Sequence, residues 1–419
     1  MNIRHTIALS VLFASLCGAS PCVAQVDSLV FNTEDAHIAP TEKNELRFNL
    51  QALAFFKDNE FNSKDVVKGY TLPGMWISPS ISYQPLHNLT VEVGAHMLHY
   101  WGADRYPTTN IGDLTRNNDD KTTKAFHCVP LFRANLQLSD KVNIVLGSIY
   151  GKAFHQLTEP LYNSERCLTA DPETGVQLIW NNHWLHFDTW VDWQKFIYKR
   201  DNKQEEFTYG LSARLLANPK TKATQVYFPL QVLMHHIGGE INTEAQERSI
   251  KTWLNAATGV GINIPLNTRI PTSINSEVTA HYYSQQKGTA LPYKNGTGIF
   301  AKVQAKVWNF CATASYWYSN KFISIYGNPL FNAIGNTDEV NLMSKPRMFI
   351  LQAEYAQQIG HGFSWGVSIA YDIHNQKSIY HTETSTWDKG KATSDLGAGI
   401  YLRLNPSFLI KKFKTEQTH

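Results

Sequence analysis

Bulky apolar residues alternate with small or polar residues along most of this chain. The segment from Phe363 to His374 shows the pattern clearly, because Phe, Trp, Val, Ile and Tyr fill every second position and Ser, Gly, Ala and Asp lie between them. The side chains of a β-strand point alternately to opposite faces, so this segment has one apolar and one polar face. Similar segments recur from Leu46 to Leu404 and predict an all-β protein.

The alternation divides into about sixteen predicted strands, although fourteen or eighteen would also fit it. An even number is what a single-chain bacterial membrane barrel requires. We place the strands at residues 44–56, 69–83, 88–101, 125–138, 141–150, 174–182, 184–197, 205–216, 223–236, 252–265, 272–284, 296–307, 309–320, 348–358, 362–374 and 394–405.

The connections between these strands alternate in length. Those after the even-numbered strands are short, whereas the longest of the others cover residues 102–124, 151–173, 321–347 and 375–393. Outer-membrane barrels have short periplasmic turns and long external loops, so both termini are expected in the periplasm. The pattern predicts a closed antiparallel transmembrane β-barrel, and the alternative of a soluble sandwich is disfavoured by the aromatic residues near the strand ends.

The chain begins with features of a secretory signal peptide. Arg4 precedes an apolar run from Ile7 to Cys17, and Cys22 to Ala24 resembles a cleavage site. We therefore divide the chain into a signal peptide at 1–24, a periplasmic lead-in at 25–43, the barrel at 44–405 and a C-terminal tail at 406–419. The protein is expected in the outer membrane of a Gram-negative bacterium.

Composition narrows the class of protein further. Aromatic residues make up 12% of the chain, yet no apolar stretch after the signal is long enough for a membrane-spanning helix. The net charge of +3 comes without a basic stripe, so no nucleic acid partner is expected. Three cysteines remain after the signal, Cys128, Cys167 and Cys311, which give no disulfide framework and leave only a Cys128–Cys167 pair open.

The last predicted strand carries a family resemblance. Asp395, Gly397, Ile400 and Leu402 are spaced as in the insertion signal of bacterial outer-membrane barrels, which implies handling by the barrel-assembly machinery. The whole chain resembles a porin-like barrel, and general porins are trimers whose long third external loop folds into the lumen. The resemblance implies a possible homotrimer and a constriction loop at residues 151–173, with candidate residues His155, Glu159, Tyr162, Glu165 and Arg166.

Strand parity assigns one set of polar and aromatic side chains to the lumen. Charges of both signs occur in it, which disfavours a strongly anion-selective pore. The aromatic members suit stacking on sugars, or they simply fill a wide lumen. The candidate pore-lining residues are Arg47, Glu92, Arg133, Asp188, Trp190, Asp192, Arg214, Tyr227, Trp253, Glu277, Tyr283, Lys302, Lys306, Trp317, Glu354, Asp372 and Arg403.

Catalytic and metal-binding patterns are weak by comparison. Asp188 and Asp192 share a face but lie too far apart along a strand for a glycosidase pair, and no Gly-x-Ser-x-Gly motif occurs. His235 and His236 are adjacent on a strand and so point to opposite faces. We expect no enzyme activity, no cofactor and no metal.

These observations predict an outer-membrane channel for passive or weakly selective diffusion of small hydrophilic solutes, with sugars as one option. The expected partners are outer-membrane lipid and those solutes. Two alternatives stay open. One is a barrel that attaches or exports a surface polysaccharide, which would have a plugged lumen. The other is a membrane-embedded hydrolase, which needs a Ser or Asp converging with a His.

Overall fold

The computed structural model describes residues 26–414 apart from 64–65, 102–125, 219–223, 240–248, 267, 336–340, 361, 376–377 and 383. The predicted signal peptide and the predicted loop 102–124 lie outside the described residues. None of the helices that are described is long and apolar enough to cross a membrane.

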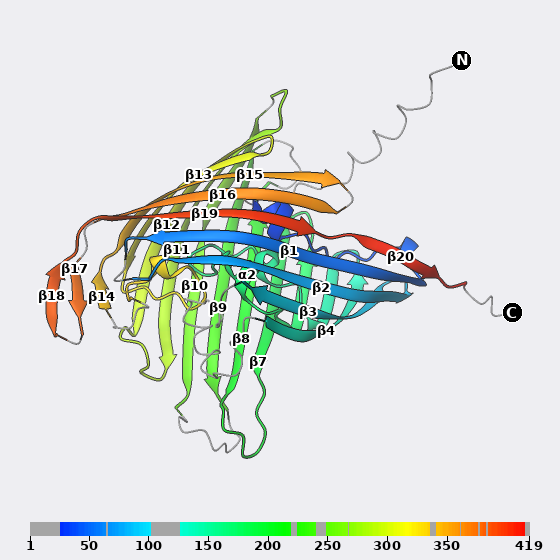
Figure 1. Cartoon of the computed structure of the whole chain (residues 1–419), viewed down its shortest axis with the longest axis horizontal. Coiled ribbons are helices and arrows are strands. Elements are labelled where there is room, and N and C mark those ends of the chain that lie inside the picture. The colour runs from blue at the N-terminus through cyan, green and yellow to red at the C-terminus, as the bar shows by residue number, and fades with distance from the viewer. Residues whose placement is uncertain are drawn as a thin grey trace.

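One antiparallel sheet closes on itself to form a barrel (Figure 1). Successive strands along the chain are neighbours in the wall, as the alternating loop lengths require. The strands are β1 (Glu45–Phe61), β2 (Tyr70–Leu86), β3 (Leu89–Tyr100), β4 (Phe126–Ser139), β5 (Val142–Ser148), β6 (Thr174–Asn181), β7 (Leu185–Lys195), β8 (Glu205–Leu216), β9 (Gln225–Gly238), β10 (Lys251–Leu266), β11 (Thr272–Lys287), β12 (Asn295–Val307), β13 (Phe310–Asn320), β15 (Arg347–Gly360), β16 (Phe363–His374), β19 (Thr393–Leu404) and β20 (Ser407–Lys412).

The first strand closes the ring. β1 pairs with β2 on one side and with both β19 and β20 on the other. β20 continues the line of β19 beyond Pro406, so the two together occupy one place in the wall. The predicted closed barrel of sixteen strands is confirmed, and residues 407–412, which the sequence analysis assigns to a tail, form part of its wall.

A second, smaller sheet lies beyond the end of the barrel opposite β20 (Figure 1). It consists of β14 (Asn341–Ser344), β17 (Ser378–His381) and β18 (Thr386–Lys389), which come from two of the long predicted loops. These strands therefore extend the loops outward rather than adding to the wall.

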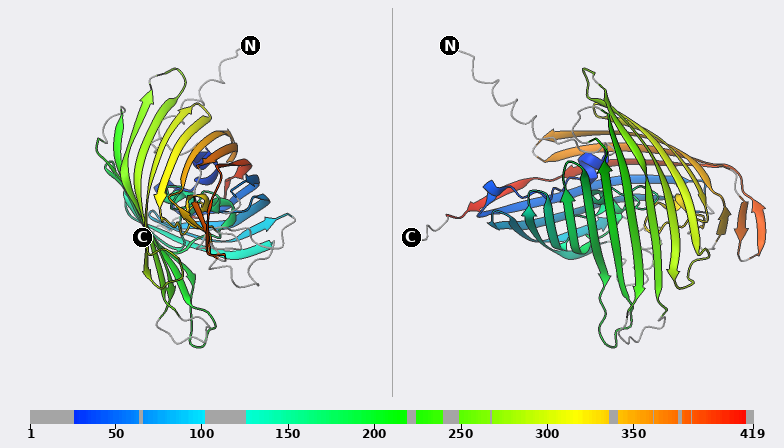
Figure 2. Two further views of the ribbon diagram at one scale, coloured as in Figure 1. Left: turned by 90° about the vertical axis from the view of Figure 1, so that its left-hand side faces the viewer. Right: turned by 180° about the vertical axis from the view of Figure 1, so that it is seen from behind.

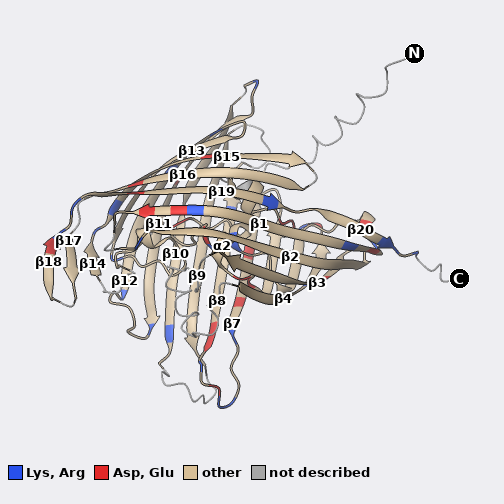
Figure 3. Cartoon of the chain, viewed as in Figure 1, with Lys and Arg blue, Asp and Glu red and all other residues tan. Residues whose placement is uncertain are grey.

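The two faces of the wall differ as the alternation predicts. Phe132, Phe228, Leu230 and Ile400 are each about half exposed on the outside of the barrel, at 46% to 53% of their surface. Charged residues, blue and red in Figure 3, occupy only short stretches of the strands. Such an apolar outer surface is stable only against lipid tails, because water would order around it at a cost of about 25 cal/mol per Å².

Three chain segments fill the inside of the barrel (Figure 2): residues 26–38, 149–173 and 321–335. The first includes η1 (Asp27–Phe31) and is followed by η2 (Pro40–Glu42). Val26 and Val30 are fully buried beside Tyr401, and the carbonyl of Ala36 accepts hydrogen bonds from the amides of Asn135 and Asn143, each at 2.8 Å. The predicted periplasmic lead-in therefore runs largely inside the wall.

The third segment, residues 321–335, builds an apolar core in the lumen. It includes η4 (Pro329–Phe331), and its Phe322 and Phe331 pack edge-on to Trp317 at ring distances of 5.2 and 5.3 Å. Asn255 holds the backbone of the segment, because its side-chain amide donates to the carbonyl of Ile323 and its Oδ1 accepts from the backbone N–H of Ile325. A barrel interior filled in this way is a packed core over this part of the described chain.

Candidate functional site

The candidate pore-lining residues all lie on the inward positions of their strands, and none of their side chains is exposed. They do not come together at one place. Trp253, Tyr283 and Trp317 are almost completely buried in one apolar cluster, which also includes residues of the segment 321–335. Other members pair locally across the wall, since Arg214 stacks over Tyr227 at 4.5 Å and the Tyr227 hydroxyl donates to Glu277 at 2.9 Å.

Two cavities inside the described part of the barrel are lined by several of the other candidates. The larger, about 190 Å³, is bounded by β12, β13, β15, β16 and β19, and its lining includes the candidates Lys302, Glu354, Asp372 and Glu159. The smaller, about 90 Å³, lies between β2, β3 and β4 and the segment 149–173, and its lining includes the candidates Glu92, Arg133 and Arg403. Arg47 contacts Glu45 and Ser407 near the end of the barrel where β1 pairs with β20.

The segment 149–173, the candidate constriction loop, lies within the barrel. It contains η3 (Lys152–His155) and α2 (Arg166–Thr169), and four of its five candidate residues are buried. The guanidinium of Arg166 is stacked between the rings of Tyr162 and Tyr326, at 4.8 and 4.5 Å. Since Tyr326 belongs to the segment 321–335, Arg166 joins two of the three inner segments. Glu165 forms an ion pair with Lys57 of β1 at 2.7 Å.

His155 fixes the same segment to β7. Its ring stacks on Trp190 at 3.4 Å, Nδ1 lies 2.6 Å from Asp188 and Nε2 lies 2.7 Å from Glu173. Burial alone would lower the pKa of His155, but the two carboxylates raise it to about 9. His155 is therefore a cation at neutral pH, held between two anions.

Raising the pH should loosen the segment 149–173. The pKa of His155 is about 9 in the folded protein and 6.5 as an ordinary side chain, so its stabilisation is complete below pH 6.5 and is lost as the pH rises through about 9. Hydrogen exchange of peptides from this segment, corrected for the intrinsic rate, should show less protection at pH 10 than at pH 7. His155→Gln should show weak protection at both values, and equal protection of the wild type at both would contradict the expectation.

Gly210 on β8 is required for the position of Trp190. A Cβ atom at Gly210 would lie 2.1 Å from the Trp190 ring, which His155 already contacts at 3.4 Å. We expect Gly210→Ala to lower the free energy of unfolding by about 1–3 kcal/mol, as overpacking does. Gly397→Ala is the control, because its Cβ would meet only Asn59 Oδ1, at 3.2 Å. Urea unfolding in detergent would measure both, and equal stabilities would refute the packing argument.

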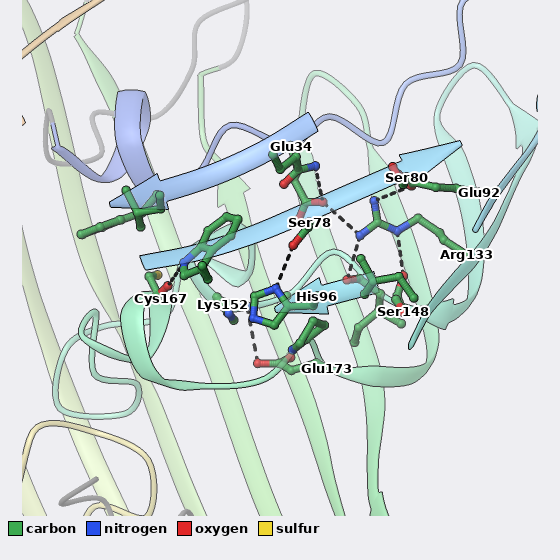
Figure 4. Close-up of a pocket in the computed structure, with 18 of the residues that line it drawn as sticks. Glu34, Ser78, Ser80, Glu92, His96, Arg133, Ser148, Lys152, Cys167 and Glu173 are labelled. Atoms are coloured by element: carbon green, nitrogen blue, oxygen red, sulfur yellow. Dashed lines mark hydrogen bonds and ion pairs between the residues drawn. The ribbon is translucent and has the colours of Figure 1, made fainter. Parts of the chain in front are cut away.

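The smaller cavity contains a serine and a histidine in hydrogen-bond contact (Figure 4). Ser78 Oγ lies 2.8 Å from His96 Nδ1, and both side chains are buried. The register that pairs Ile77 of β2 with Met97 of β3 sets the two residues opposite each other. Neither Ser78 nor His96 is among the candidate residues predicted from the sequence. The register of the predicted hairpin was the signal that could have found them.

Basic and acidic side chains surround this pair. Arg133 binds Glu34 at 3.0 Å and Glu92 at 3.4 Å, and Glu92 accepts a hydrogen bond from Ser80 (Figure 4). The backbone carbonyl of Cys167 accepts a hydrogen bond from Trp76 at 3.0 Å. Cys128, Cys167 and Cys311 form no disulfide with one another, so the Cys128–Cys167 pair is not formed. No group of three or more His, Cys, Asp or Glu that could hold a metal is found over the described part of the chain.

A family model described as lipid A 3'-O-deacylase-type matches residues 38–413, which is almost the whole barrel. The chain belongs to this family. No curated protein matches it closely enough to count as a relative. The barrel is an integral outer-membrane protein of porin-like architecture, as the sequence predicts, and membrane lipid surrounds it. Handling by the barrel-assembly machinery and a homotrimer stay predictions.

Several solved structures are similar to this chain over most of its length. OccK8 (OprE) from Pseudomonas aeruginosa has a TM-score of 0.49 at 9% identity, over 88% of this chain and 99% of that one. OpdK from the same species, crystallised with vanillate, has a TM-score of 0.48 at 10% identity, over 87% and 100%. OccAB4 from Acinetobacter baumannii has a TM-score of 0.43 at 9% identity, over 88% and 100%.

Proposed function

We propose that this protein is an acyl-ester hydrolase of the outer membrane that acts on lipid A or a similar acylated glycolipid. The observation that carries the proposal is the 2.8 Å contact between Ser78 Oγ and His96 Nδ1 inside a buried cavity. Membership of the lipid A 3'-O-deacylase-type family supports it. The sequence alone favours a non-enzymatic channel and keeps a membrane-embedded hydrolase as an alternative. Membership of the family favours the hydrolase.

The two side chains have the chemistry for nucleophilic acyl transfer. His96 Nδ1 would accept the hydroxyl proton as Ser78 Oγ attacks the ester carbonyl, which requires the tautomer with hydrogen on Nε2. The imidazolium would then give that proton to the departing alkoxide and leave Ser78 acylated. Water, deprotonated by the same imidazole, would release the fatty acid and restore the serine hydroxyl.

The wall beside the cavity offers a route for a lipid. β4 pairs with β5 only from Arg133 onward, because β5 ends at Ser148, so the part of β4 from Phe126 to Phe132 rises above it. Leu131 on this part of β4 lines the cavity together with Ser148 and Pro172. An acyl chain in the outer leaflet would reach the cavity at this low point of the rim, if the long loops face the cell exterior as their lengths predict.

Mass spectrometry of lipid A provides the test. Purified protein in detergent would be incubated with lipid A, and the product analysed for the loss of one ester-linked acyl chain and the appearance of the free fatty acid. Intact lipid A after incubation with folded protein would contradict the proposal. Neutral short-chain esters, which need no membrane, would show whether the failure lies in the chemistry or in substrate access.

A narrow channel is the second candidate function, and the larger cavity favours it. Its wall carries amides, hydroxyls and charges of both signs, among them Lys302, Gln304, Glu354 and Asp372. Small hydrophilic solutes, with sugars as one option, would pass along this wall once the inner segments move aside. Liposome swelling with sugars of increasing size tests it: passage that falls with size supports a channel, and no passage of any sugar speaks against one.

A further inference from the structure

We propose that the smaller cavity binds a phosphate group, held by Arg403, Lys152 and His96 around the indole of Trp76. As a binding site it does not depend on hydrolysis. As the place where a phosphorylated substrate is anchored, it rests on the function proposed above. The four residues come from β19, from the segment 149–173 and from the hairpin of β2 and β3, so the fold gathers them from distant parts of the chain.

Trp76 is the common neighbour of the three nitrogen-bearing groups. The guanidinium of Arg403 lies 4.6 Å from the centre of its ring, the ammonium of Lys152 lies 5.8 Å from it, and the imidazole of His96 lies 5.4 Å from it. Trp76 is itself fixed, because its Nε1 donates to the carbonyl of Cys167 at 3.0 Å. Two cations and an imidazole thus converge on one wall of the cavity.

Two buried nitrogen atoms in this cavity have no hydrogen-bond partner among the described residues. They are Nε2 of His96 and Nε of Arg403, and each side chain is about 2% exposed. His96 Nδ1 is occupied by Ser78, and the terminal nitrogen of Arg403 donates to Thr33 and Gln51. A buried donor without an acceptor is costly, so both nitrogens call for an acceptor from a ligand.

The carboxylates that line the cavity are paired with other cations. Glu34 and Glu92 bind Arg133, and Glu173 binds His155. Their charges are therefore largely compensated, although Glu34 also lies within electrostatic reach of Arg403. No ion pair of the Arg403 or Lys152 side chain is found within the described ranges, which leaves positive charge for an anionic ligand.

Size and chemistry favour phosphate. The cavity of about 90 Å³ is several times the 10–15 Å³ that one water needs, so it accommodates a group of several heavy atoms. A planar guanidinium and a flexible ammonium are the side chains that proteins use for phosphate oxygens, through charge-assisted hydrogen bonds. The source is either a lipid phosphate that enters at the rim or a free phosphate.

Calorimetric titration of the full-length protein in detergent tests the site. The probes are inorganic phosphate and dihexanoyl phosphatidic acid, with dihexanoyl glycerol as the uncharged counterpart. Arg403→Gln and Lys152→Gln should each weaken phosphate binding about tenfold or more, because each removes a charge-assisted contact. Binding of the lipid phosphate but not of the glycerol identifies a lipid ligand, and binding of inorganic phosphate alone identifies a soluble one.

Matched variants control for general effects of charge removal. Lys321→Gln removes an ammonium that lies 5.8 Å from Tyr293, and Arg214→Gln removes a guanidinium that lies 4.5 Å from Tyr227. Both should bind phosphate like the wild type. Ser78→Ala should lose hydrolysis and keep phosphate binding, which separates this inference from the proposed function.

Two outcomes would overturn the site. One is a wild type that binds neither phosphate probe, and the other is an affinity that falls as much in the two control variants as in Arg403→Gln and Lys152→Gln. If Arg403→Gln fails to fold, Lys152→Gln decides the question, because Lys152 lies outside the strands of the wall.

Discussion

Replacing Ser78 by alanine is expected to abolish ester hydrolysis and leave the barrel folded. The hydroxyl is the only atom of this residue that the proposed chemistry uses, and without it His96 has no nucleophile to activate. Loss of a nucleophile that acts together with a base lowers kcat by about 10³-fold or more. The measurement is the rate of fatty acid release from lipid A, followed by mass spectrometry at saturating substrate.

Ser82→Ala is the matched control for this experiment. Ser82 lies four residues along the same strand and accepts a hydrogen bond from Asn49 at 2.9 Å, outside the lining of the cavity. It should hydrolyse lipid A at the wild-type rate. His96→Gln should be as slow as Ser78→Ala, because the two groups act as one unit. A Ser78→Ala protein with undiminished activity would show that the reaction takes place elsewhere.

The fold is predictable from the sequence because every strand of a membrane barrel must alternate lipid-facing and inward-facing residues. The outward residues must suit lipid, so Phe228 and Leu230 alternate with inward partners that need not be apolar. Strand β20 is missed because Pro406 reads as the end of the pattern, whereas Ser407 to Lys412 pair again with β1 beyond it. A proline at the edge of a pairing interrupts one hydrogen bond without ending the line of the strand.

The filling of the lumen is not predictable in the same way. Residues 26–38 lack periodicity, and their burial depends on distant partners such as Asn135 and Asn143. The position of the segment 149–173 inside the barrel likewise depends on contacts such as those of His155 with Asp188 and of Arg166 with Tyr326. Strand parity predicts that wall residues such as Asn135 and Asp188 face the inside of the barrel. It does not predict whether they contact water or another segment of the chain there.

The serine–histidine pair escapes a motif search for a related reason. The Gly-x-Ser-x-Gly pattern describes a turn between a strand and a helix, whereas Ser78 and His96 lie within the strands β2 and β3. These reactive groups meet across two strands, where the spacing in sequence is set by the hairpin turn between Leu86 and Leu89. Reading predicted hairpins for inward Ser, His and Asp at facing positions is the search that would find Ser78 and His96.

Deleting residues 152–171 should turn the filled barrel into a conducting one. The deletion removes His155 and Arg166, and with them the contacts that hold one inner segment to β7 and to the segment 321–335. Barrels of sixteen strands are wide enough for an aqueous channel when their lumen is not filled. Single-channel conductance in planar bilayers should rise from small or unmeasurable steps to large, stable ones.

A deletion outside the barrel controls for a general loosening of the structure. Residues 378–389 contain β17 and β18, which form part of the small sheet beyond the rim and take no part in the wall. Their removal should leave the conductance unchanged. If the deletion of 152–171 also left the conductance unchanged while the barrel stayed folded, residues 321–335 and 26–38 would have to block the lumen alone. The segment 149–173 would then have no constricting role, and its movement could not open the channel proposed as the second candidate function.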